Sequence, residues 1–246
     1  MTITSGTPQR LYLMQLSTTT LPLAAGRTLA MSSGCYLVQI SDGKNILIDS
    51  GLPADYTSPP GTPPAEHTKN VLEHLADVGL HPDDITLLIC SHFDVDHAGY
   101  HDAFAKAELI VQRQHYELAR SGQLRFSPAR AHWDHPSLRY RLVEGDTELL
   151  PGVTLLETSG HAPGHQSVLV RLPQTGPVLL AIDAVMMQRQ FTPDRAAWPV
   201  DDNEEQLRAS TSKLLYLVER KHVALVVFGH DGEQWQTLKT APAYYE

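Results

Sequence analysis

Residues 87–99, which read LLICSHFDVDHAG, place four potential metal ligands within six positions, and this density limits the chain more than any other feature does. An extended chain turns alternate side chains to one side, so His92, Asp94 and Asp96 share a side while His97 points elsewhere. Clusters of imidazoles and carboxylates are typical of divalent metal sites, and this arrangement suits two neighbouring ions better than one. The alternative is a polar loop at the end of a strand.

The composition is ordinary for a soluble globular enzyme, and we expect its substrate to be a small molecule. The 246 residues are 42% hydrophobic and 19% charged, which predicts one domain over residues 1–246 with a substantial core. A formal net charge of −9 disfavours nucleic acid and anionic membranes as partners. The two cysteines, Cys35 and Cys90, lie in apolar runs and are expected to be buried thiols rather than a disulfide.

The sequence also bears on where the protein works. The N-terminal stretch lacks a basic region followed by a long apolar segment, and no apolar run reaches the roughly 18 residues of a membrane-spanning helix. We therefore expect neither secretion nor membrane insertion, and a cytoplasmic location. A homodimer is left open.

Two halves of the chain share one order of elements. Apolar runs predict strands over residues 46–49 and 85–90, with a helix beginning near Val71 between them. Later, strands over 179–182 and 223–228 flank a helix over about 203–221. Each half runs strand, aspartate, helix, strand, histidine, which predicts two similar sheets that are covered by helices and meet where the polar strand ends converge.

The segment over residues 113–141 is rich in arginine within an otherwise acidic chain. Six arginines alternate there with aromatic residues: Arg113, Arg120, Arg125, Arg130, Arg139 and Arg141 with Phe126, Trp133 and Tyr140. Such a segment could cover a site. A solvated, irregular insertion is the alternative, because charged runs usually coat surfaces.

The polar residues at the strand ends form an ordered set: Asp49, the run from His92 to His97, His161, Asp183 and His230. This set resembles the five motifs of the metallo-β-lactamase superfamily. Within it, the segments SGHAPGHQSVLVRLP, LLAIDA and GHDGEQW with APAYY are most similar to the N-acyl-homoserine lactonase group. The resemblance implies an α/β fold, an αββα four-layer sandwich of two mixed sheets flanked by helices.

The resemblance also implies roles for individual residues. The first ion would be held by His92, Asp94 and His161, and the second by Asp96, His97 and His230. Asp183 would bridge both ions, and Asp49 would orient a ligand imidazole. Asp96 and Asp183 would thus be catalytic, beside a hydroxide between the two ions that attacks the substrate. Zinc is the favoured metal, with manganese or iron as alternatives.

Two positions depart from the family pattern. Asp94 stands where the family run has its second histidine, and Met186 stands where the lactonases have a tyrosine. With Asp94, Asp96 and Asp183 ionised, three carboxylates and one hydroxide would balance two divalent ions. The centre would then be a weaker Lewis acid, and the added oxygen ligand would favour harder ions such as manganese or iron(II).

The leading functional hypothesis is a dinuclear hydrolase that opens a lactone, with quorum-quenching hydrolysis of N-acyl-homoserine lactones as the specific case. The alternatives are an ester or thioester hydrolase of the glyoxalase II type and a metal-bound sensing or binding protein of the same fold. The Pro-rich loop over residues 52–64 could supply apolar walls for an acyl chain, together with Phe93, Tyr100, Met186 and Met187.

Overall fold

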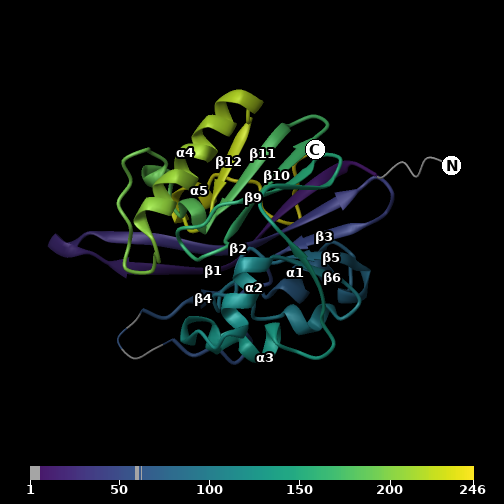
Figure 1. The fold of residues 1–246 in the computed structure, drawn as a ribbon, viewed down its shortest axis with the longest axis horizontal. Coiled ribbons are helices and arrows are strands. Elements are labelled where there is room, and N and C mark those ends of the chain that lie inside the picture. The colour runs from purple at the N-terminus through teal and green to yellow at the C-terminus, as the bar shows by residue number, and fades with distance from the viewer. Residues whose placement is uncertain (1–5, 59–60, 62) are drawn as a thin grey trace.

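Two mixed β-sheets pack face to face in the computed structural model, which describes residues 6–58, 61 and 63–246 (Figure 1). Helices α1 (Val71–Asp77), α2 (Arg113–Arg120) and α3 (Arg130–Trp133) cover the outer side of the first sheet. Helices α4 (Glu204–Lys221) and α5 (Gly232–Trp235) lie on the side of the second sheet. The predicted αββα sandwich is therefore confirmed.

The first sheet has seven strands in the order β4-β1-β2-β3-β5-β6-β7. Strands β1, β2, β3 and β4 pair antiparallel, whereas β3, β5, β6 and β7 are parallel. The strands are β1 (Pro8–Pro22), β2 (Thr28–Ile40), β3 (Asn45–Ile48), β4 (Glu66–His67), β5 (Ile85–Ile89), β6 (Glu108–Gln112) and β7 (Arg139–Val143).

The second sheet has five strands in the order β12-β11-β10-β9-β8. Strands β8 to β11 pair antiparallel, and β12 runs parallel to β11. The strands are β8 (Thr147–Leu150), β9 (Val153–Glu157), β10 (Gln166–Leu172), β11 (Gly176–Ile182) and β12 (Leu225–Phe228).

Alternating side chains divide the core into three layers. Along β1, Leu11 and Leu13 face the second sheet, whereas Tyr12 and Met14 face the helices on the other side. The layer between the sheets joins such residues to the inner side chains of β10 and β11. A third layer packs α4 on the second sheet through Leu214. Each sheet is thus apolar on both faces, and polar ligands gather at the strand ends.

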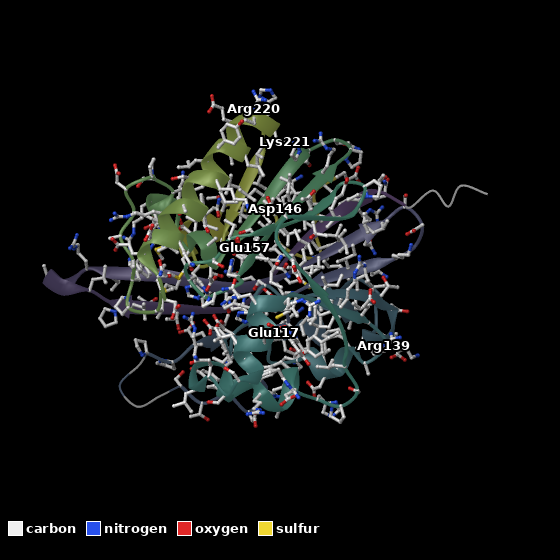
Figure 2. All side chains as sticks on the ribbon, in the orientation of Figure 1. Glu117, Arg139, Asp146, Glu157, Arg220 and Lys221 are labelled. Carbon is white, nitrogen blue, oxygen red and sulfur yellow. The ribbon has the colours of Figure 1, made fainter. Side chains whose placement is uncertain are left out.

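The helix boundaries follow from capping residues. Asn70 accepts hydrogen bonds from the backbone N–H groups of Leu72 and Glu73, and the Glu73 carboxylate accepts one from the Asn70 N–H, which completes a capping box at α1. Asn203 caps α4 by accepting from the Gln206 N–H. Charged side chains of these and other elements, including Arg139, Arg220 and Lys221, lie on the surface (Figure 2).

The structure extends some predicted elements and adds others. The apolar residues 11–16 and 35–40 lie in β1 and β2, which extend beyond these runs to form a hairpin whose far end is polar. The arginine-rich segment contains two α-helices, a 3₁₀ helix and the start of strand β7 rather than irregular chain. Cys35 and Cys90 are free and buried, as predicted. In the part of the chain that the structure describes, no helix is long and apolar enough to cross a membrane.

Candidate metal centre

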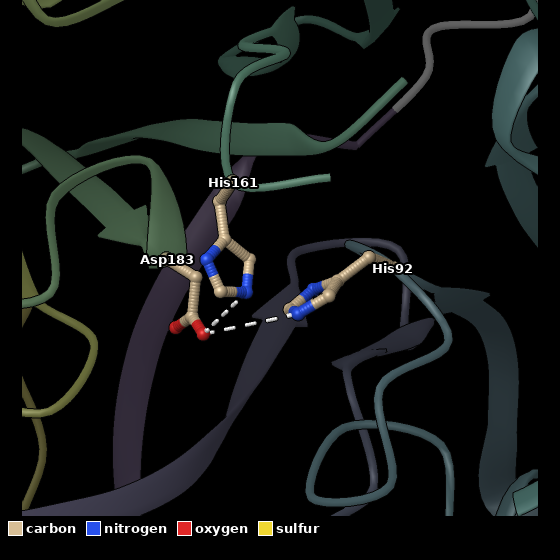
Figure 3. A group of neighbouring side chains, drawn as sticks. All are labelled: His92, His161 and Asp183. Atoms are coloured by element: carbon tan, nitrogen blue, oxygen red, sulfur yellow. Dashed lines mark ion pairs between the residues drawn. The ribbon is translucent and has the colours of Figure 1, made fainter. Parts of the chain in front are cut away.

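The predicted ligands converge from both sheets. The segment after β5 carries His92, Asp96 and His97, the turn between β9 and β10 carries His161, and Asp183 directly follows β11. Among the described residues there are two sets of three donor residues, and within each set the donor atoms lie within 4.8 Å of one another. One set is His92, His161 and Asp183, and the other is Asp96, His97 and His230. The first set, here called the first triad, is drawn in Figure 3. The other is the second triad.

The Asp183 carboxylate lies between the two triads. Its Oδ2 atom is 3.3 Å from His161 Nε2 and 3.8 Å from His92 Nε2. Dashed lines mark these two pairs in Figure 3. Its Oδ1 atom is 3.1 Å from His230 Nε2 in the second triad. One carboxylate therefore faces both donor sets, which is the placement a bridging ligand needs.

The donor atoms fit divalent metal ions. Three buried atoms at the centre have no hydrogen-bond partner: His92 Nε2, His97 Nε2 and Asp183 Oδ1. Buried polar groups without partners are costly, and metal coordination would satisfy all three. Imidazole nitrogen and carboxylate oxygen are ligands for zinc and for manganese or iron. The residues present therefore suit the metal centre that the sequence motifs imply.

Strained backbone aims Asp183 at the centre. The preceding residue, Ile182, has φ 52° and ψ −135°, a rare conformation for a β-branched side chain, and the pairing with β12 shifts register beside it. Such strain typically costs about 1–3 kcal/mol and persists where the surroundings enforce it. Gly229 packs closely here, since a Cβ atom on it would lie 2.6 Å from Asp183 Oδ1. Packing thus fixes the carboxylate position.

The ring nitrogens that face away from the centre have partners of their own. Asp49 Oδ2 accepts from His97 Nδ1 at 2.9 Å, and the Ser32 carbonyl accepts from His230 Nδ1 at 2.9 Å. Asp201 Oδ1 accepts from His161 Nδ1 at 2.9 Å. Such outer partners fix the tautomer so that Nε2 is left to bind metal. Asp49 lies where the predicted orienting role requires, whereas Asp201 was missed because no motif surrounds it.

The surrounding carboxylates also set the charge of the His161 ring. Burial alone would lower its pKa, but Asp183, the hydrogen bond to Asp201 and Asp94 together raise the pKa to about 9. A cation is therefore favoured at the His161 ring, and it can be either a proton or a metal ion.

Asp94 belongs to neither triad and is ion-paired. Arg125, from the arginine-rich segment, donates to both carboxylate oxygens of Asp94, with distances of 2.7 Å and 2.5 Å. Burial alone would raise the pKa of Asp94, but Arg125 together with His92 and His161 holds it well below its usual value. The charge count made from sequence therefore needs correction, because it left out the Arg125 cation. Of the two interpretations of the arginine-rich segment, this contact favours a segment that covers a site over a solvated insertion.

His115, whose side chain is fully buried, links the two ligand-bearing segments. Its Nε2 accepts from the Phe93 N–H at 2.8 Å, and its Nδ1 donates to the Pro163 carbonyl at 2.7 Å. This pair of bonds requires a neutral ring. Burial accordingly lowers the pKa of His115 to about 4.

We expect the free energy of unfolding to decrease as the pH falls from about 6.5, the pKa of a histidine in the unfolded chain, toward 4, the pKa of His115 in the fold. His115, and His101 with a pKa lowered to about 3 by burial, stay neutral in the fold but bind protons when unfolded. Stability is therefore complete above this window and decreases within it, by up to about 1.4 kcal/mol per pH unit for each histidine. Denaturant titrations across the window measure the slope.

His115→Gln should flatten that slope, and replacement of the exposed His135 by glutamine is the matched control. An unchanged slope in the His115 variant would contradict the linkage argument.

None of the four residues predicted to line a substrate pocket lines the cavity that adjoins the second triad. Phe93 is fully buried and stacks on Trp133, with ring centroids 4.7 Å apart. Met186 and Met187 are 2% exposed, and Tyr100 lines a separate cavity of about 300 Å³. Instead, a cavity of about 340 Å³ adjoins the second triad. Its described lining includes Met31, Leu52, Tyr56, Ser58, Pro63, Ala65, Val95, Asp96 and His230.

The fold and the paired triads define a metal-dependent enzyme scaffold, and comparison with known proteins agrees. The family model described as the metallo-beta-lactamase superfamily matches residues 30–230. An N-acyl homoserine lactonase of Bacillus sp is 35% identical over 233 residues, which are 90% of each chain. The N-acyl homoserine lactonase AiiA of Bacillus thuringiensis subsp. kurstaki is 34% identical over the same length and coverage.

Solved structures extend the likeness. An N-acyl homoserine lactone hydrolase with the product N-hexanoyl-L-homoserine bound at its catalytic metal centre has a TM-score of 0.85 and 32% identity, covering 97% of this chain and 100% of that one. AidC, a dizinc quorum-quenching lactonase, has a TM-score of 0.71 at 16% identity, covering 98% of this chain and 96% of its own, a likeness of fold alone. The chain belongs to the metallo-β-lactamase superfamily and, within it, to the family of the N-acyl homoserine lactonases.

Proposed function

We propose that this protein is a dinuclear metal-dependent hydrolase that opens the lactone ring of N-acyl-homoserine lactones. The observation that carries the proposal is the Asp183 carboxylate, which faces His161 of one triad and His230 of the other. The relatives named as lactonases supply the reaction class. A lactone is a neutral electrophile and needs no cationic pocket for binding. A substrate without negative charge is compatible with a chain whose net charge is −9.

Each side chain has a role in this proposal. The first ion would be held by His92, Asp94, His161 and Asp183, and the second by Asp96, His97 and His230, with Asp183 shared. Zinc is the proposed metal, with manganese or iron as alternatives. When bound, the two ions supply Lewis acidity toward water and toward the lactone carbonyl. Asp49 and Asp201 hold the imidazoles of His97 and His161 in position through their Nδ1 atoms.

The cavity beside Asp96 and His230 is the proposed site of the acyl chain. Its volume of about 340 Å³ lies within the range of small-ligand pockets. Met31, Leu52 and Val95 supply apolar surface, and Tyr56 comes from the Pro-rich loop. The cavity begins at two proposed ligands, so a chain lying in it would place the lactone beside the ions.

Ala65→Trp should raise KM for long-chain N-acyl-homoserine lactones about tenfold, or ~1.4 kcal/mol, and leave short-chain KM unchanged. Ala65 lines the cavity, and a tryptophan there would fill space that a long acyl chain needs. Steady-state kinetics on a butanoyl and a decanoyl substrate measure the effect. Ala65→Ser is the control with little added volume, and an equal loss on both substrates would contradict this placement of the chain.

The test of the reaction class compares kcat/KM for N-acyl-homoserine lactones, glutathione thioesters and simple aryl esters on metal-analysed protein. We expect the lactones to be hydrolysed fastest. A thioester preferred by roughly a hundredfold, or ~2.7 kcal/mol, would overturn the lactonase assignment and leave the metal site standing. Metal-loaded protein that hydrolyses none of the three would instead point to a binding protein.

A further inference from the structure

The Asp94 carboxylate is held by Arg125 in a two-pronged ion pair. Arg125 Nε donates to Asp94 Oδ1 at 2.7 Å, and Nη2 donates to Oδ2 at 2.5 Å. The remaining Nη1 donates to the His161 carbonyl at 2.8 Å, and Nη2 also lies 2.8 Å from His161 Nε2. The side chains of Arg125 and Asp94 are 28% and 18% exposed, so water screens this pair only in part. Bidentate arginine–carboxylate pairs combine strength with a fixed geometry.

Arg125 is set apart from the other arginines of its segment. It lies in the 3₁₀ helix Leu124–Ala129, which is anchored by the buried Phe126 against the His115 ring, with centroids 4.8 Å apart. Trp133 Nε1 donates to the Phe126 carbonyl at 2.8 Å and fixes the same turn. In contrast, Arg130 is exposed and pairs with Asp134. The fold thus directs one arginine of the segment inward.

The position of Asp94 Oδ2 suits a metal ligand. It lies 3.3 Å from His92 Nε2 and 3.2 Å from His161 Nε2. Ligand atoms bound at about 2.0–2.1 Å around a tetrahedral ion are separated by roughly 3.3 Å. A carboxylate here adds a negative charge that a neutral imidazole would not add, and Arg125 brings the matching positive charge.

We propose that Arg125 is a positioning residue of the metal centre, which holds the Asp94 carboxylate in place and cancels its charge. The Asp94–Arg125 pair then does what a neutral histidine would do: it offers one donor atom and adds no net charge. Metal ligands are generally held by such outer partners, and loss of one typically costs 10–100-fold in metal affinity. The inference rests on the proposed dinuclear site and adds a residue outside its ligand set.

The test is a double-mutant comparison with zinc affinity as the readout, measured by competition with a chromophoric chelator. The variants are Arg125→Gln, Asp94→His and the double variant, with Arg130→Gln as the matched control from the same segment. Circular dichroism and thermal unfolding verify that each variant is folded. The readout needs no turnover.

In the Asp94 background, Arg125→Gln should weaken binding of at least one zinc ion about 10–100-fold. In the Asp94→His background, the same change should leave affinity unchanged or improve it, because the guanidinium no longer has a carboxylate to neutralise. Arg130→Gln should bind zinc as the unaltered protein does. Equal losses in both backgrounds, or no loss in either, would overturn the proposal.

Arg125→Lys separates charge from geometry and guards against misfolding of the glutamine variant. Lysine keeps the positive charge but lacks the planar fork, so it should recover part of the lost affinity. A lysine variant no better than glutamine would contradict the charge argument. Unaltered protein that binds two zinc ions yet opens no lactone would contradict the proposed function alone, because these outcomes concern zinc affinity.

Discussion

Asp183→Asn should abolish most lactone hydrolysis and remove at least one of the two metal ions. The carboxylate faces both triads, with Oδ2 3.3 Å from His161 Nε2 and Oδ1 3.1 Å from His230 Nε2. The amide has nearly the same size but lacks the charge that holds two cations. We expect kcat/KM to fall by at least about a hundredfold. Removing a residue that only hydrogen-bonds a metal ligand typically costs up to this much, and removing a bridging ligand should cost at least as much. Elemental analysis and steady-state kinetics measure both effects.

Asp146→Asn is the matched control for this variant. Asp146 undergoes the same chemical change, but it is exposed (Figure 2). Its carboxylate pairs with Lys213 of α4. This control should keep both ions and full turnover. Asp183→Asn protein that retains two ions and near-normal kcat/KM would show that the carboxylate does not bridge the triads.

Removal of the metal ions by a strong chelator should lower the melting temperature substantially as well as activity. The chelated protein would keep buried donors such as His92 Nε2 and His97 Nε2 without partners. A ligand at a thousand times its dissociation constant stabilises the fold by about 4 kcal/mol per site. For a domain of this size, that corresponds to roughly 8–16 °C for each ion. Differential scanning calorimetry before and after chelation measures the shift.

Reconstitution separates the metals and supplies the control. Adding back zinc, manganese or iron(II) one at a time should restore melting temperature and turnover together, and the most effective ion identifies the preferred metal. The Asp183→Asn variant should show a smaller shift on chelation, because it begins with fewer ions. Chelated protein with unchanged melting temperature and activity would rule out a metal-dependent site.

The features that sequence predicted well are local. The run from His92 to His97 falls within six positions, so its chemistry can be recognised without knowledge of the fold. Strands of the core were predicted because their side chains are apolar on both faces, as in β3 and β5. The polar far end of the hairpin, where Thr18 pairs with Ser32, gives no such apolar pattern and was missed.

The partners that complete the site could not be predicted because they are distant in sequence. Arg125 lies 31 positions from Asp94, and Asp201 lies 40 positions from His161. No periodic pattern links residues at such separations. Nothing in the sequence distinguishes Arg125 from the other five arginines of its segment, because its position depends on the 3₁₀ helix in which it lies. Phe93 and Met186 were predicted to line a substrate pocket because they are apolar, but the fold buries both side chains.

Each triad draws its donors from both halves of the chain, which makes metal capture a late event in biogenesis. His97 is made early, but its partner His230 follows β12, and the residues of β12 must first dock beside β11. A domain generally folds as a unit, so both triads need the whole chain to be available. A nascent or truncated chain that ends before His230 therefore presents an incomplete second triad. Tight metal retention thus reports that the last strand has docked.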